Sequence, residues 1–247
     1  MVTHAHFLPI NLPARRATGR VAASGSVFST TCPACNKCIL HLYIEGPVSH
    51  NMCIMHIAKV LVIMGSTRAR RICPQLAEWV AQIGSETLEA HFEVVDLKDW
   101  PLPMDDEPGI PAMDRYAFEH TRAWSRKVSD AQAFVFVTPQ YNWGYPAPLK
   151  NALDHLYQEW SGKPAMIVTY GGHAGSKCSR QLRQVLKGLK MRPVAIRPGF
   201  RLTLDQIKAN TGSIDPAAQF GKHEKRVRKA FFQLGARLNG LPSWRWW

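Results

Sequence analysis

The chain has 247 residues, 46% of them hydrophobic, which is enough for one domain with a sizeable core and extensions. Its six cysteines are too few and too clustered for a disulfide-stapled secreted domain, and no apolar run is long enough to cross a membrane. The net charge is +13, most of it near the two ends. Because charge runs are weak signals by themselves, we expect no nucleic-acid partner.

Residues 1–56 are predicted to be a disordered or non-native extension. Met52 and Met55 both precede the first strand and either can act as a start. The segment carries Arg15, Arg16 and several Ser, Thr and Ala residues but no acid before position 45, a composition typical of a transit peptide. We therefore expect a cytoplasmic protein, or a mitochondrial one if the extension is a genuine transit peptide.

Three cysteines of this extension follow one another at two-residue spacings: Cys32, Cys35 and Cys38. Thiolates at this spacing can bind one metal ion or an iron–sulfur cluster. The ferredoxin pattern needs a fourth cysteine where Leu42 stands, and nothing fixes the geometry of His41, His50 or Cys53 as a zinc ligand. We assign no metal site here.

Five near-continuous apolar runs follow, as expected of strands buried on both faces: residues 58–64, 92–97, 133–139, 164–170 and 193–199. Helical patterns lie between them, and this alternation predicts an α/β fold with a doubly wound parallel sheet. With five strands, we expect the flavodoxin-like order 2-1-3-4-5, helices on both faces, and a domain spanning residues 57–200. Ligands bind such sheets beyond the carboxyl ends of the strands, between the first and the third.

Apolar residues at helical spacing mark three of the helices. The first group is Ala117, Thr121, Trp124 and Val128, the second is Leu149, Leu153 and Leu156, and the third is Val227, Phe231, Leu234 and Leu238. The third group lies in a C-terminal extension, residues 201–247, where the basic run Lys222–Phe232 is interpreted as the solvated face of an amphipathic helix.

The loop after the first strand, Gly65–Arg71, reads GSTRARR and leads into a helix. Ser66 and Thr67 offer hydroxyls, Arg68 and Arg71 offer positive charge, and the helix start offers free N–H groups, which together suit a phosphate. The loop lacks the pattern of a nucleoside-triphosphate P-loop. An ordinary capped helix start explains the same residues equally well.

The loops after the third and fourth strands read PQYNWGYPAP (139–148) and YGGHAGSK (170–177). The first combines flat aromatic rings with amides that can bond the edge of a heterocycle, although such aromatics also serve as core or interface anchors. The second has adjacent glycines that let the backbone approach a planar ligand. The three loops together predict a site for a phosphate joined to a ring system, which is the shape of flavin mononucleotide (FMN).

These motifs, in this order and spacing, resemble the NADPH-dependent FMN reductase family of flavodoxin-like flavoproteins, over about residues 58–199. The resemblance implies that Ser66, Arg68 and Arg71 hold the FMN phosphate. It implies that Pro139, Gln140, Tyr141 and Asn142 line the ribityl chain and ring, and that Tyr170, Gly171, Gly172 and His173 contact the isoalloxazine from the opposite loop. The chain departs from the family at Gln140, where many members have Glu, and at Arg71 and Cys73, where they have Ser and Asn.

The resemblance also implies the activity. NADPH or NADH would reduce the bound flavin by hydride transfer, and the electrons would pass to a quinone, a free flavin or a similar acceptor. Because the cofactor performs this chemistry, we expect no catalytic acid–base side chain. Family members are dimers or tetramers, and Leu149–Trp160 is the interface helix that the resemblance implies here. Two alternatives stay open: a flavodoxin-like electron carrier without NAD(P)H oxidation, and a flavin-free binding protein that uses its basic tails.

Overall fold

The structure, a computed structural model, describes residues 57–104, 106–113 and 115–240. The described residues belong to one compact unit. The predictions for residues 1–56, including the three-cysteine cluster, lie outside the described part of the chain. No helix among the described residues is long and apolar enough to span a membrane.

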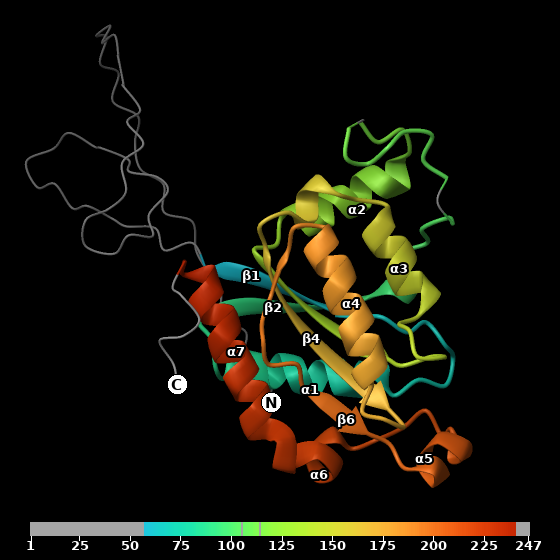
Figure 1. The fold of residues 1–247 in the computed structure, drawn as a ribbon, viewed down its shortest axis with the longest axis vertical. Helices are drawn as coiled ribbons and strands as arrows, with labels where there is room; N and C mark the ends of the chain where they lie inside the picture. The colour runs from blue at the N-terminus through green and yellow to red at the C-terminus, as the bar shows by residue number, and fades with distance from the viewer. Residues whose placement is uncertain (1–56, 105, 114, 241–247) are drawn as a thin grey trace, which may run out of the picture. The chain divides into compact units, whose positions relative to one another are not determined.

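The molecule is built on a parallel sheet in the order β2-β1-β3-β4-β5, with β6 also paired to β4, which confirms the predicted fold (Figure 1). The strands are β1 (Ala58–Met64), β2 (Ala90–Asp96), β3 (Ala133–Pro139), β4 (Pro164–Gly171), β5 (Arg192–Pro193) and β6 (Gly199–Arg201). The helices are α1 (Cys73–Ser85), α2 (Glu119–Ser129), α3 (Ala147–Asp154), α4 (Ser176–Gly188), α5 (Leu204–Ala209), α6 (Pro216–Phe220) and α7 (Glu224–Leu238). Three 3-10 turns complete the list: η1 (Leu97–Asp99), η2 (Gln158–Trp160) and η3 (Gly221–His223).

Each face of the sheet carries its own hydrophobic core, because side chains alternate along a strand. Val60 and Val62 of β1 pack with α1 and α7, whereas Leu61 and Ile63 pack with α2, α3 and α4. Figure 1 shows the strands between these two sets of helices. Every residue of β3 and β4 is buried, which explains why their sequences are apolar without interruption.

The predicted fifth strand is divided into two short strands, β5 and β6, that both pair with β4. Pro193 and Pro198 lack the N–H that a strand would donate. Between them the backbone N–H of Ile196 donates to Gln233 Oε1 of α7 at 2.9 Å instead of to a strand. The sheet therefore has six strands rather than five, because β5 and β6 pair with different parts of β4 along the same edge.

Two helix boundaries differ from the sequence prediction. Ala117 lies outside α2 and is exposed, because the Glu107 carboxylate accepts hydrogen bonds from the N–H groups of Ala117 and Phe118, at 2.8 and 3.1 Å. The helix predicted up to Trp160 stops at Asp154 and resumes only as η2. The apolar face of α7 is confirmed, with Val227, Phe231 and Leu234 fully buried.

Candidate functional site

A cavity of about 890 Å³ opens at the carboxyl ends of β1, β3 and β4, where the sequence predicted a ligand. Its volume lies at the upper end of the range of about 300–1,000 Å³ that small-molecule and cofactor sites occupy. Its walls are the loop after β1, the start of the loop after β3, the end of β4, and α5 with the residues that follow it. The loops after β1, β3 and β4 are far apart in the sequence but meet at this cavity, and the α5 region covers it.

The loop after β1 brings cationic side chains to the start of α1. Arg68, Arg70 and Arg71 line the cavity together with Ile72, the residue that precedes the helix. The N-cap residue Ile72 offers no capping side chain, no other described side chain caps α1, and its first turn contains no acid. Free N–H groups at a helix start, beside guanidinium groups, favour a phosphate. The hydroxyls of Ser66 and Thr67 do not cap this helix.

Arg71 is already partly neutralised by the protein. Its guanidinium forms an ion pair with Asp96 at the end of β2, and its Nη1 donates to the carbonyl oxygen of Arg68 at 3.1 Å. Its Nε is buried without a hydrogen-bond partner among the described residues. A buried donor without a partner is costly, so an anion that reached Nε would stabilise the loop. Arg68 and Arg70 are exposed and form no ion pair among the described residues.

Tyr141 is the aromatic residue of the second loop that faces the cavity. Its hydroxyl lies 2.8 Å from Ser66 Oγ, and the guanidinium carbon of Arg68 lies 3.6 Å from its ring centroid. Two residues with positive φ, Asn142 and Trp143, then form the tight turn that brings Gly144 back to Tyr141. Neither Asn142 nor Trp143 lines the cavity. Trp143 is 61% exposed, and Lys177 Nζ lies 4.5 Å from the centroid of its ring.

Gln140 joins the second loop to the third. Its side-chain Oε1 accepts hydrogen bonds from the N–H groups of Lys177 and Cys178 in the first turn of α4, at 3.0 and 3.2 Å. The residue in the N-cap position is Gly175, which has φ +68° and no side chain to cap with. Gln140 therefore caps α4 from another loop, and its oxygen is not free to bond a ligand.

The end of β4 gives the cavity a flat backbone wall of Tyr170, Gly171 and Gly172. A Cβ at Gly172 would lie 3.6 Å from the Ile207 side chain of α5, in ordinary van der Waals contact, so only a narrow space separates this wall from α5. Gly171 has φ +142°, a conformation that side chains rarely adopt. This wall suits the close approach of a planar ligand.

The α5 segment, residues 203–214, forms the opposite wall and was not predicted as part of the site. Thr203 and Gln206 form a capping box that starts α5, and none of the helix is buried. The Gln75 side chain donates to the carbonyl oxygen of Gly212 at 3.3 Å, which ties the end of the segment to α1. The sequence signal was weak, because six residues are too few for a hydrophobic period.

The eleven predicted site residues divide into two groups. Eight line the cavity: Arg68, Arg71, Pro139, Gln140, Tyr141, Tyr170, Gly171 and Gly172. Three do not: Ser66 is fully buried behind Tyr141, whereas Asn142 and His173 are exposed on turns. Residues that line the cavity without having been predicted include Arg70, Leu202, Ile207 and Lys208.

No carboxylate, imidazole or thiol appears among the described residues that line the cavity. Cys73 and Cys178, the two cysteines in the described part of the chain, are buried, and burial raises the pKa of Cys73 to about 11 and that of Cys178 to about 12. Burial also raises the pKa of the Tyr170 phenol. These groups stay protonated at neutral pH, so the cavity is suited to binding rather than to acid–base or nucleophilic chemistry.

A second cavity, of about 460 Å³, lies beside the start of α4 and contains three arginines, Arg180, Arg197 and Arg226. No carboxylate lines it, and none of the three forms an ion pair within the described part of the chain. Burial, followed by the charges of Arg183, Arg180 and Arg226, lowers the pKa of Arg197. We call this the arginine cavity.

The sequence profile of the NADPH-dependent FMN reductase family matches residues 58–197. An NAD(P)H-dependent FMN reductase of Schizosaccharomyces pombe is 55% identical over 187 residues, which cover 75% of this chain and 92% of that protein. A quinone reductase of Escherichia coli is 29% identical over 52% of this chain and 69% of its own length.

Among solved structures, the flavoenzyme NAD(P)H:(acceptor) oxidoreductase FerB of Paracoccus denitrificans superposes with a TM-score of 0.57. Its sequence identity is 20%, and the match covers 74% of this chain and 98% of that chain, so it supports the fold. The family profile covers more than half of the chain, and the Schizosaccharomyces relative is aligned over nearly its whole length. The chain belongs to the NADPH-dependent FMN reductase family.

Proposed function

We propose that this protein is an FMN-dependent NAD(P)H oxidoreductase that passes electrons to a quinone, a free flavin or a similar acceptor. The observation that carries the proposal is the cavity at the strand ends, with a cationic helix start at one end and a flat, glycine-lined wall at the other. Relatives named as FMN reductases and quinone reductases support the same class of reaction.

The residues present fit the phosphate of FMN. Within the described part of the chain, the start of α1 is uncapped and offers N–H groups, Arg68 and Arg70 form no ion pair, and Arg71 has a buried Nε without a hydrogen-bond partner. Ser66 would act through Tyr141, because their hydroxyls are bonded to one another. Arg71 would hold the loop against Asp96 as well as contribute charge.

The ring system fits between Tyr141 and the backbone of Gly171 and Gly172, with α5 covering the outer side. When bound, the flavin supplies the two-electron chemistry between the nicotinamide and the acceptor. The chain's own residues bind and orient the reactants and exclude water. Asn142 and His173 would contact the ring only after their turns move, so we expect a smaller contribution from them.

The absorption spectrum of the purified protein tests this function. We expect a bound-flavin spectrum that bleaches when NADPH is added without oxygen, and that returns when a quinone is added. A bound flavin that NADPH leaves oxidised would favour the electron-carrier alternative. A protein that neither contains nor takes up FMN would contradict the proposal.

Two variants separate binding from chemistry. Arg68→Gln removes a cation from the phosphate end, and we expect FMN affinity to fall about tenfold or more, because charge-assisted hydrogen bonds contribute about 1.5–3 kcal/mol each. His173→Ala should leave the rate of flavin reduction largely unchanged. A reduction rate lowered by orders of magnitude in His173→Ala, with FMN still bound, would show that an acid–base side chain takes part.

A homodimer or homotetramer is part of the proposal. Several large apolar side chains are exposed near the loop that precedes α2, and these are Met104, Ile110, Met113 and Phe118. Exposed apolar groups in one region favour an interface. Light scattering after size exclusion gives the mass directly, and a monomer at micromolar concentration would contradict this part. A cytoplasmic location stays a prediction from the sequence.

A further inference from the structure

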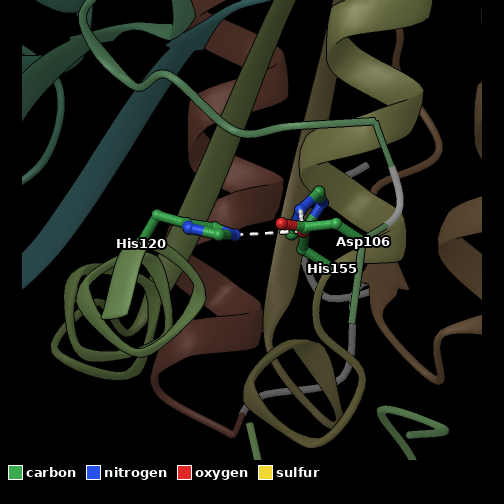
Figure 2. A group of neighbouring side chains, drawn as sticks. All are labelled: Asp106, His120 and His155. Atoms are coloured by element: carbon green, nitrogen blue, oxygen red, sulfur yellow. Dashed lines mark hydrogen bonds and ion pairs between the residues drawn. The ribbon is translucent and has the colours of Figure 1, made fainter. Parts of the chain in front are cut away.

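Three potential metal ligands meet on the far side of the sheet from α1. Asp106 lies in the loop before α2, His120 is in the first turn of α2, and His155 follows the last residue of α3 (Figure 2). Their ligand atoms all lie within 4.8 Å of one another. Asp106 Oδ1 is 3.0 Å from His120 Nε2 and 3.8 Å from His155 Nε2. None of the three lines the flavin cavity.

Of the three residues, His155 gives the strongest indication of a metal site, and its side chain is only 1% exposed. Its Nδ1 lies 2.9 Å from the carbonyl oxygen of Asn151, which can only accept a hydrogen bond, so Nδ1 carries the proton. The other ring nitrogen, Nε2, is buried without a hydrogen-bond partner among the described residues. A backbone carbonyl that fixes Nδ1–H and leaves Nε2 free is the usual arrangement of a metal-binding histidine.

The ring of His120 is held in place from two sides. Phe118 stacks on it with the planes 13° apart and the centroids 5.4 Å apart. The His155 ring meets it edge-on at 6.1 Å. Figure 2 shows His120 and His155 converging on the Asp106 carboxylate from different elements. The Asp106 side chain is 32% exposed, so an ion can enter from solvent on this side.

The geometry points to a divalent transition-metal site, and we propose that Asp106, His120 and His155 bind Zn²⁺. Two imidazoles and one carboxylate are ligands that zinc accepts, at about 2.0–2.2 Å. A tetrahedral ion at that distance places its ligand atoms about 3.4 Å apart, between the two separations measured to Asp106 Oδ1. Water occupies the fourth position.

Because none of the three ligands lines the flavin cavity, we assign the bound ion a role in holding the fold rather than in the flavin reaction. Bound zinc would join the loop before α2 to the end of α3 and so fix the polypeptide between η1 and α2. It would also satisfy the buried Nε2 of His155, which has no hydrogen-bond partner among the described residues. The alternative is that His155 Nε2 carries a proton. Asp106, His120 and His155 would then form an ion-pair cluster without affinity for zinc.

Zinc titration of the full-length, tag-free protein loaded with FMN tests the proposal. Cys32, Cys35 and Cys38 are alternative zinc ligands, so the titration uses a background in which all three are serine. In this background we expect one equivalent of Zn²⁺ to bind and to raise the melting temperature, because binding to the folded state stabilises it. Co²⁺ bound in place of zinc should show no thiolate charge-transfer band.

His120→Gln and Asp106→Asn each remove a partly exposed ligand, so both variants should fold. We expect each to weaken zinc binding at least a hundredfold and to abolish the rise in melting temperature. His91→Gln changes an exposed histidine on β2 and should bind zinc like the background. One equivalent bound with unchanged affinity in both ligand variants, or no binding in the background, would overturn the proposal.

Discussion

Gln140 shows how a single side chain can organise the candidate site without contacting the ligand. Its amide oxygen caps α4, a helix that begins 36 residues later, and so ties the second loop to the third. The sequence could not reveal this role, because nothing near Gly175 signals a cap and the partner is remote. A glutamate carboxylate in its place would accept the same two hydrogen bonds.

We therefore expect Gln140→Ala to lower the free energy of unfolding of the flavin-free protein by about 1 kcal/mol, the usual cost of removing a helix cap. In a domain of this size, that corresponds to a fall of about 2–4 °C in melting temperature. Gln140→Glu should match or exceed the wild type, because a negative charge at a helix start is favourable. Differential scanning calorimetry of the two variants and the wild type measures these melting temperatures.

Gln82→Ala is the matched control, since Gln82 is exposed and its side chain donates to Glu86, the C-cap residue of α1, at 3.2 Å. Its effect should stay within about 0.5 kcal/mol, as for ordinary surface substitutions. If Gln140→Ala and Gln82→Ala melted at the same temperature, the cap would contribute nothing measurable.

At the scale of elements, the long buried strands were predictable and the covering segment was not. The strands β1, β3 and β4 are apolar runs bounded by polar loops and are mostly or wholly buried, so their burial could be inferred from the sequence. The strand β2 reads AHFEVVD, and only Val95 in it is buried. The α5 segment has no buried residue and no apolar period, and its place depends on contacts with α1 and β4 made only in the folded chain. The same holds for β5 and β6, which are only two and three residues long.

The α5 segment should behave as a cover of low local stability. A helix of six residues is marginal by itself, so its capping box carries much of its stability. Thr203→Ala removes the hydroxyl that Gln206 N–H donates to, at 3.2 Å. We expect amide exchange in residues 204–209 to rise about fivefold, since a cap contributes about 1 kcal/mol, while the global melting temperature hardly changes.

Hydrogen exchange by mass spectrometry measures this, with Asp215→Ala as the matched control. Asp215 caps α6 by accepting from Ala218 N–H at 3.1 Å, so its loss should raise exchange in α6 and leave α5 unaffected. Equal exchange of residues 204–209 in Thr203→Ala and wild type would show that tertiary contacts, rather than the cap, hold the segment.

At the scale of the whole molecule, the net charge of +13 means that some positively charged side chains lie close together without an acidic neighbour. The arginine cavity brings together side chains from α4, α7 and the chain before β6 with no carboxylate among them. Such an arrangement destabilises the folded state through repulsion, and dissolved salt screens that repulsion. Part of the stability of this protein should therefore depend on ionic strength.

Arg226→Gln tests this, because it removes one of the repelling charges while glutamine and arginine have similar helix propensities. We expect the melting temperature to rise by about 1–2 °C at low salt, a shift typical of one exposed charge pair. The gain should disappear near 1 M salt, where the screening length falls to about 3 Å. Lys229→Gln removes an exposed charge from the same helix but outside the cavity, and should give a smaller gain. If Arg226→Gln melted at or below the wild-type temperature in low salt, the arginines would not repel one another appreciably in the folded protein.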